Sequence, residues 1–335
     1  FSKSNFDRVK QSYPQAGSSF KPFIYASAFA NGYKASDLVN DAPIIFEDSN
    51  LESSWRPENY TGKFYGPIRL REALVQSVNL VSIKLLREMG IFSTQDFLSR
   101  FGFSSSRLAP DLSLALGSSS FSPAEMVRAY SMLVNPKEPR DLFFIERIID
   151  RDGTIIFQNP QQENKSKSFD AFPWFETQLT EEIKPFYLLS PIEKDSFEPI
   201  DPRVAFITKD ILRESLSRGS NGARTRILNR KDIAGKTGTT NDAISTWFSG
   251  FHNNLVTTVW IGTDDFSSLG DNEFGSTIAL PAWVDFMKTA LTSLPQEKWK
   301  IPNGLSYVRV DRETGKPVDE NSKNSYFELF LDEDT

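Results

Sequence analysis

Three groups of polar residues in this sequence have the types and spacing that nucleophilic catalysis requires, and the first pairs a serine with a lysine. Ser18 and Lys21 lie in the segment Gly17-Ser18-Ser19-Phe20-Lys21-Pro22, and Lys21 is the sole lysine with a serine three residues before it. On a helix, positions i and i+3 share a face, so the amine can reach the hydroxyl. A serine becomes a good nucleophile when a neighbouring base takes its proton. Lysine is such a base only when burial or a nearby cation lowers its pKa; an exposed pair on a helix would have no such role.

The second group is Ser77-Val78-Asn79, which follows a predicted helix. A hydroxyl and an amide two residues apart can point the same way from a turn. There they could relay a proton to a leaving amine and hydrogen-bond a substrate amide. An ordinary polar turn or helix cap has the same pattern, and the pattern recurs at Ser322-Lys323-Asn324. Taken alone, this group is weak evidence for a site.

The third group, Ala234-Gly235-Lys236-Thr237-Gly238-Thr239-Thr240, lies on a predicted strand. Lys236 would place a cation beside a substrate carboxylate and beside Lys21, and the hydroxyls of Thr237 and Thr239 add donors. Gly238 has no side chain, so a substrate backbone could approach the strand edge closely. A backbone N–H at that edge could complete an oxyanion hole. A glycine-rich strand end without any catalytic role is the alternative.

The elements that must position these groups follow from hydrophobic periodicity and turn residues. Helices are expected at residues 18–31, 68–75, 81–89, 94–101, 122–134, 203–217 and 281–294. Strands are expected at residues 143–149, 154–157, 232–237, 246–251 and 255–262. We expect an extended loop over 43–66, a mobile insertion over about 158–202, and a partly disordered C-terminal appendage over 295–335. Helices followed by an antiparallel sheet and a final helix predict an α+β fold.

Composition excludes several classes of function. The net charge is -6 and the pI is about 5.2, which argues against nucleic acid as a partner. The chain has no cysteine and one histidine, His252, so thiol catalysis and most zinc sites are excluded. We therefore predict neither a metal nor a cofactor. A Ser-His-Asp hydrolase would have to use His252, which lies in a predicted hairpin tip.

Together the three groups indicate a family. Their order, Ser-x-x-Lys, then Ser-x-Asn, then Lys-Thr-Gly, is that of the penicillin-recognising serine enzymes. Over residues 5–310 the chain resembles the transpeptidase domain of class A, bifunctional penicillin-binding proteins, and most of all the Gram-negative type 1A subgroup. Besides the three groups, the resemblance rests on residues 55–60, 66–74, 113–117, 237–242, 247–250 and 259–262.

The resemblance implies a five-stranded, largely antiparallel sheet between helices, with an all-helical subdomain. It places the domain at 1–294, on the periplasmic face of the inner membrane. It also implies that the parent protein carries a membrane anchor and a glycosyltransferase domain, which this chain lacks. Only 17 residues precede Ser18, which leaves little chain for the strand that family members have there.

The resemblance further implies that Ser18 attacks the D-Ala-D-Ala bond of a peptidoglycan stem peptide and releases D-Ala. An amine of a neighbouring stem then resolves the acyl-enzyme, and β-lactams acylate the same serine. Lys21 would be the base, with Ser77 and Asn79 in proton relay and substrate binding. Lys236, Thr237 and Thr239 would hold the substrate carboxylate. The backbone N–H groups of Ser18 and Thr239 would form the oxyanion hole.

Three related functions stay open on these residues. A D,D-carboxypeptidase uses the same acyl-enzyme but lets water finish the reaction. A β-lactam sensor keeps the serine and lysine for acylation without transpeptidation. A β-lactamase needs an additional base for deacylation, and no segment of this chain resembles the loop that supplies that glutamate in class A β-lactamases.

Overall fold

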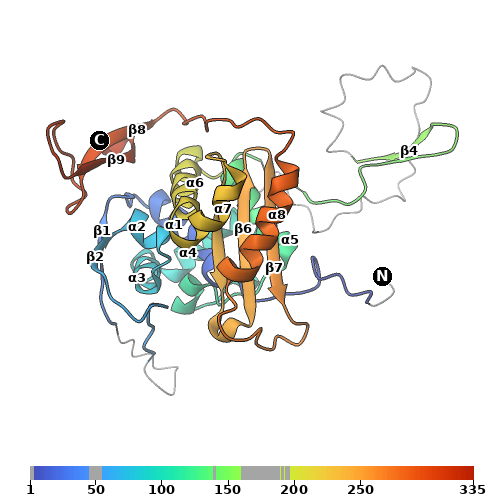
Figure 1. The fold of residues 1–335 in the computed structure, drawn as a ribbon, viewed down its shortest axis with the longest axis horizontal. Helices are drawn as coiled ribbons and strands as arrows, with labels where there is room; N and C mark the ends of the chain where they lie inside the picture. Colours follow the sequence, from blue (N-terminus) through green and yellow to red (C-terminus); the bar gives the residue numbers. More distant parts are fainter. Residues whose placement is uncertain (1–3, 45–54, 139–140, 160–188, 190–191, 193–196) are drawn as a thin grey trace.

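A computed structural model describes residues 4–44, 55–138, 141–159, 189, 192 and 197–335, and it shows an α+β fold (Figure 1). The central sheet is antiparallel, with strand order β5-β6-β7, and is built from Ala234–Thr239, Ser245–His252 and Leu255–Gly262. The expected strands at 232–237, 246–251 and 255–262 are thereby confirmed, the first with its bounds two residues later in the chain. Helices α5 (Pro123–Val134) and α6 (Pro202–Ser217) cover one face of this sheet, and α8 (Leu280–Ala290) covers the other.

Strand β6 is buried on both faces, since its successive side chains point in opposite directions and all of them are buried. Trp247 belongs to the large core that the sheet shares with the helices of the N-terminal half. Its neighbour Phe248 belongs to a smaller core under α8, where its ring packs against Trp283 with the centroids 4.9 Å apart. Both faces of β6 are therefore closed to solvent, and the chemistry must take place at an edge of the sheet.

The sheet has fewer strands than the family resemblance implies. Among the described residues the central sheet has three strands rather than five. The segment ahead of the nucleophile, residues 4–16, forms turns and one isolated bridge, between Gln15 and Ser120, instead of a further strand. As a consequence β5 is an edge strand, and its outer side faces the turn that carries Ser18.

The expected helices are present, with shifted ends. Pro22 lies in the first turn of the first helix, as its missing N–H predicts. The helix expected at 68–75 begins only at residue 70, because Ile68 and Arg69 pair with β1 as part of β2. Helix bounds are Lys21–Ala30 (α1), Leu70–Val75 (α2), Asn79–Met89 (α3), Ile91–Ser99 (α4), Pro123–Val134 (α5), Pro202–Ser217 (α6), Gly219–Thr225 (α7) and Leu280–Ala290 (α8).

Two further pairs of short antiparallel strands lie in the N-terminal half of the chain. Strands β1 (Leu38–Asp41) and β2 (Gly66–Arg69) pair antiparallel beside α3. Strands β3 (Arg147–Ile149) and β4 (Ile155–Gln158) form the hairpin expected around Asp152-Gly153. Of the expected loop at 43–66, residues 55–65 are irregular and 45–54 lie outside the described residues. Most of the expected insertion at 158–202 lies outside them as well.

The prediction of a partly disordered appendage over 295–335 is wrong. Leu305–Asp311 (β8) and Ser325–Leu331 (β9) pair over their whole length. The acidic composition concealed apolar residues that pack, since Val310, Leu329 and Phe330 are buried. The hairpin lies against the side of the molecule that carries β1, β2 and α2 (Figure 1). In the described part of the chain, no helix has the length and apolar character needed to cross a membrane.

Candidate active site

The nucleophile candidate Ser18 lies in a tight turn that packs against the edge of β5. Residues Gly17–Phe20 form a 3₁₀ turn, and α1 begins at Lys21. Gly17 has φ +54, and a Cβ there would lie 2.8 Å from the carbonyl oxygen of Thr239. From the other side, a Cβ on Gly117 would lie 2.0 Å from the oxygen of Gly17. Only glycine fits at these two positions, and the close packing places Ser18 beside Thr239.

Lys21 is completely buried one turn after Ser18. Its Nζ donates to the carbonyl oxygen of Ser77 at 2.6 Å and to Oδ1 of Asn79 at 2.6 Å. Burial, and next the positive charge of Lys236, hold the pKa of Lys21 well below its usual 10.5. Desolvation penalises the charged form of an amine, so burial favours the neutral form of Lys21. The condition that sequence reasoning set for a lysine base is therefore met.

Ser77 lies between the two lysines. Its Oγ is 3.4 Å from Nζ of Lys21 and accepts a hydrogen bond from Nζ of Lys236 at 2.9 Å. Ser77 follows α2 in the left-handed region, at φ +59. The N–H of Ser77 bonds to Leu74 and the N–H of Val78 to Ala73, which makes a C-terminal motif that usually carries glycine at this position. A serine here is strained, and strain of this kind marks functional positions.

Asn79, the first residue of α3, is held by a residue that sequence reasoning did not assign to the site. Oδ1 of Asn59 accepts the backbone N–H groups of Asn79 at 2.9 Å and of Leu80 at 3.3 Å, so Asn59 caps α3 from a distant loop. Nδ2 of Asn59 in turn donates to the fully buried carboxylate of Asp41. The resemblance covered residues 55–60, which was the one available signal. Spacing could not reveal a cap that lies 20 residues away.

The outer edge of β5 carries an outward-pointing backbone N–H beside the turn that holds Ser18. The N–H of Thr240 bonds to the oxygen of Ser245, so Thr240 and Ser245 form a hydrogen-bonded pair. Pairs of that type alternate along an antiparallel ladder, and therefore the N–H and C=O of Thr239 and Thr237 point away from β6. The contact of Gly17 with Thr239 lies on that outer edge. The turn that carries Ser18 and the outward N–H of Thr239 thus lie at the same edge of β5.

Gly238 is required for packing. A Cβ at Gly238 would lie 2.8 Å from the oxygen of Ala16 and 2.9 Å from Cβ of Ser19. The glycine therefore lets the nucleophile turn approach β5, in addition to any approach of a substrate that the sequence predicted. Lys236 is also buried, and burial lowers its pKa to about 7. Its Nζ donates to the oxygen of Thr237 at 3.1 Å.

These groups open into a cleft of about 1200 Å³. Its lining includes Ser18, Ser77, Asn79, Thr237 and Thr239. The aromatic rings of Tyr60 and Phe274, which belong to opposite halves of the chain, also line it and meet edge to face with centroids 5.6 Å apart. The cleft lies between the helical part of the molecule and the edge of the sheet.

His252 takes no part in this cleft. It ends β6, is completely buried, and its Nε2 lies 3.2 Å from Oδ2 of Asp232. Asp232 also accepts hydrogen bonds from Nε and Nη2 of Arg230, each at 2.8 Å. His252 is absent from the residues that line the cleft with Ser18. Nδ1 of His252 accepts the N–H of Asn254 at 3.3 Å, so the histidine is part of the packing at the end of β6 and not of the cleft.

Comparison with known families identifies the fold that carries this cleft. The model of the penicillin binding protein transpeptidase domain matches residues 3–263. The chain belongs to this family. The order of the three motifs along the sequence had predicted it, and the chain is a penicillin-binding protein transpeptidase domain of the 1A type.

Full-length penicillin-binding proteins are similar to this domain over its whole length. The chain is 40% identical to penicillin-binding protein 1A of Pseudomonas aeruginosa over 100% of the chain and 43% of that protein. It is 34% identical to penicillin-binding protein 1A of Vibrio cholerae, over 98% of the chain and 42% of that protein. The chain thus spans less than half the length of these relatives.

Solved structures support the same fold. The crystal structure of penicillin-binding protein 1A from Haemophilus influenzae superposes with a TM-score of 0.81 at 32% identity, over 98% of this chain and 49% of that chain. PonA1 of Mycobacterium tuberculosis, at 19% identity and a TM-score of 0.67 over 88% of this chain and 74% of that chain, shares the fold. The α+β class of the penicillin-binding protein domain is confirmed.

Proposed function

We propose that this chain is a D,D-transpeptidase that cross-links peptidoglycan through an acyl-enzyme on Ser18. Ser18 attacks the D-Ala-D-Ala bond of one stem peptide and D-Ala leaves. The amine of a second stem then takes the acyl group, and β-lactams acylate the same serine. The observation that carries the proposal is the complete burial of Lys21, which follows Ser18 by one turn and contacts both residues of the Ser-x-Asn motif.

The contacts of Lys21 support its role as the base. A neutral amine has two N–H donors and one lone pair. The two short hydrogen bonds of Nζ go to the carbonyl oxygen of Ser77 and to Oδ1 of Asn79, each at 2.6 Å. The lone pair would take the proton of Ser18, which lies one turn away in the same helical segment. As Ser18 Oγ forms its bond to the carbonyl carbon, that proton passes to Lys21.

Ser77 then carries the proton onward. Because Lys236 donates to Oγ of Ser77, the hydroxyl proton of Ser77 is free to move to the leaving nitrogen of D-Ala. Ser77 recovers a proton from Lys21, which returns to its neutral state. The C–N bond breaks as the nitrogen is protonated, and Lys21 is ready for the next acyl transfer.

The edge of β5 supports the remaining roles. The N–H groups of Ser18 and Thr239 would stabilise the oxyanion that develops on the attacked carbonyl. Lys236 and the hydroxyls of Thr237 and Thr239 would hold the terminal carboxylate of the substrate, with Asn79 on its amide. Oγ of Thr239 accepts the N–H of Gly275 at 3.0 Å, so its proton is available for such a bond.

Rapid hydrolysis of the acyl-enzyme is disfavoured by the side chains around it. Among the described residues that line the cleft there is no glutamate, and the acids present are Asp242 and Asp271. We therefore expect a long-lived penicilloyl adduct rather than β-lactamase turnover. Carboxypeptidase activity differs only in the acceptor, because water and an amine would attack the same acyl-enzyme.

The full protein would act where peptidoglycan lies, outside the cytoplasmic membrane. The relatives that match the chain end to end are more than twice as long. We propose that the full protein also carries a glycosyltransferase domain and a single-pass anchor, as the class A resemblance implies.

Intact-mass spectrometry after exposure to penicillin tests the proposal. We expect one covalent adduct, located on Ser18 by peptide mapping and lost in Ser18→Ala. An adduct on another residue, or none on folded protein, would contradict the proposal. Incubation with a D-Ala-D-Ala stem peptide, with and without an acceptor amine, then separates the related functions. A cross-linked product shows a transpeptidase, hydrolysed peptide alone shows a carboxypeptidase, and no D-Ala release shows a sensor.

A further inference from the structure

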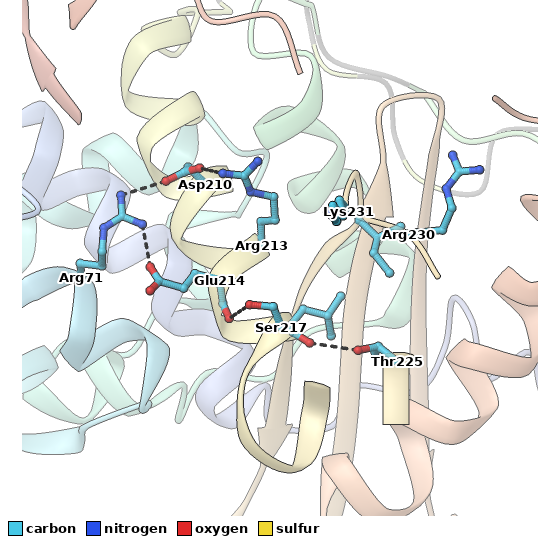
Figure 2. Close-up of a pocket in the computed structure, with 10 residues that line it drawn as sticks. Arg71, Asp210, Arg213, Glu214, Ser217, Thr225, Arg230 and Lys231 are labelled. Carbon is cyan, nitrogen blue, oxygen red and sulfur yellow. Dashed lines mark hydrogen bonds and ion pairs between the residues drawn. The ribbon is translucent and has the colours of Figure 1, made fainter. Parts of the chain in front are cut away.

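A buried network of charges connects the C-terminal hairpin to the helix that leads into the active site. Arg71, in the first turn of α2, is nine-tenths buried. Its guanidinium bonds to Asp210 and Glu214 of α6, each at 2.9 Å. Figure 2 shows Arg71 between these two carboxylates, with Arg213 on the far side of Asp210. The network borders a cavity of about 430 Å³ that is separate from the catalytic cleft.

The third carboxylate of the network, Glu328, comes from β9. It is completely buried and meets Arg71 through both Nε, at 2.7 Å, and Nη2, at 2.6 Å. A buried carboxylate is costly unless a cation and hydrogen bonds compensate it. The hairpin also places Tyr326 under the guanidinium of Arg69, 4.2 Å from the ring centroid. The hairpin therefore contacts Arg69, the last residue of β2, and Arg71, the second residue of α2.

Helix α2 transmits this contact over a short distance. It has six residues and is followed two positions later by Ser77. Arg71 and Ser77 are six residues apart, about 9 Å along a helix axis. The helix is also held by Arg218, the residue after α6, which bonds to Glu72 at 2.7 Å. A shift of Arg71 would move the whole helix, because one and a half turns have little room to bend.

We propose that the Glu328–Arg71 pair positions Ser77 between Lys21 and Lys236, so that the C-terminal hairpin determines the rate of acyl transfer although it lies outside the cleft. Glu328 and Arg71 are positioning residues: they act through α2 on the hydroxyl and carbonyl of Ser77, and touch no substrate. This inference rests on the proposed function of Ser18 and Ser77.

The test compares acylation by a fluorescent penicillin in four proteins: the unaltered chain, Glu328→Gln, Ser77→Ala and the double variant. Glu328→Gln keeps the shape of the side chain and removes its charge. We expect the acylation rate constant to fall about tenfold, since misplacement of a reacting group by less than 1 Å is enough for such a loss. The dissociation constant of the complex before acylation should change less than about twofold. In the Ser77→Ala background, Glu328→Gln should cost less than about threefold, because no hydroxyl remains to be misplaced.

Glu333→Gln is the matched control. Glu333 lies five residues further along and pairs with Arg203 of α6 at 2.8 Å, away from α2. It should leave acylation unchanged. If Glu328→Gln does not fold, Arg71→Lys takes its place, since it keeps the charge and loses the two-pronged contact.

The outcomes separate this inference from the proposed function. Equal losses in both Ser77 backgrounds, an undiminished rate in a folded variant, or failure of both variants to fold would each reduce the network to general stability and overturn the inference. An unaltered chain that is never acylated on Ser18 would instead overturn the proposed function.

Discussion

Nζ of Lys236 lies 2.9 Å from Oγ of Ser77, although 159 residues separate them in the chain. Nζ of Lys21 is 3.4 Å from the same oxygen. The hydroxyl of Ser77, in the turn before α3, thus links two buried amines, one from α1 and one from β5. Burial and the charge of Lys236 lower the pKa of Lys21, and burial lowers the pKa of Lys236.

Lys21→Met should abolish efficient acylation without unfolding the domain. Methionine has a similar volume, and it removes a buried amine that costs free energy when charged. Loss of a general base is worth about 10²- to 10⁴-fold, which the rate of labelling by fluorescent penicillin measures. Lys209→Met is the control, because Lys209 is also buried, with its pKa lowered to about 8, and packs on Trp299 away from the cleft. Equal loss in both variants would argue against a specific role for Lys21.

Ser77→Gly should separate stability from activity. Glycine adopts φ +59 without strain, so the midpoint of thermal unfolding should rise relative to Ser77→Ala, by an amount that corresponds to about 1 kcal/mol. Acylation should fall in both variants, because both lack the hydroxyl that joins the two lysines. Differential scanning calorimetry and penicillin labelling give the two values. If Ser77→Gly acylates at the normal rate, the relay through Ser77 is wrong.

Gly17→Ala should disable the nucleophile turn. The new Cβ would lie 2.8 Å from the carbonyl oxygen of Thr239, which pushes Ser18 away from the β5 edge and opens the oxyanion hole. We expect acylation to slow by about 10²-fold, the effect of losing one oxyanion donor. Gly32→Ala is the control, since Gly32 also has positive φ but no atom lies within 4 Å of its Cβ position. It should lose about 1 kcal/mol of stability and keep its acylation rate.

Stability should rise with pH between about 7 and 10, partly because of Lys236. Burial lowers its pKa to about 7 in the folded protein, against 10.5 for the ordinary lysine side chain. In that interval the unfolded chain binds more protons than the folded chain, so alkali favours folding. In Lys236→Met this contribution is absent, and urea unfolding should show a smaller rise with pH. The same rise in both proteins would mean that Lys236 keeps its ordinary pKa.

Much of the fold could be predicted because local patterns carry it. The helix over Lys21–Ala30 follows from its apolar residues, Pro22 and the Asn31-Gly32 stop, and strands β6 and β7 follow from short apolar runs around Asn253-Asn254. The start of α2 could not be predicted, because Ile68 and Arg69 have helical character but pair with β1. Residues 295–335 were expected to be partly disordered, because an acidic composition does not show that part of this segment is buried in a paired hairpin.

The sequence by itself determined the chemical groups of the site and their order, since Ser-x-x-Lys, Ser-x-Asn and Lys-Thr-Gly are local patterns with chemical meaning. Only the tertiary structure decided their state. The lowered pKa of Lys21 depends on complete burial beside Lys236, and the outward N–H of Thr239 depends on the register between β5 and β6. The tertiary structure also revealed the contacts of Asn59 and Gly17 at the site, and the contact of Glu328 with Arg71 on which the proposed positioning role rests. Their effects come from contacts across 20 to 257 residues of chain, and no spacing rule in a linear sequence records such distances.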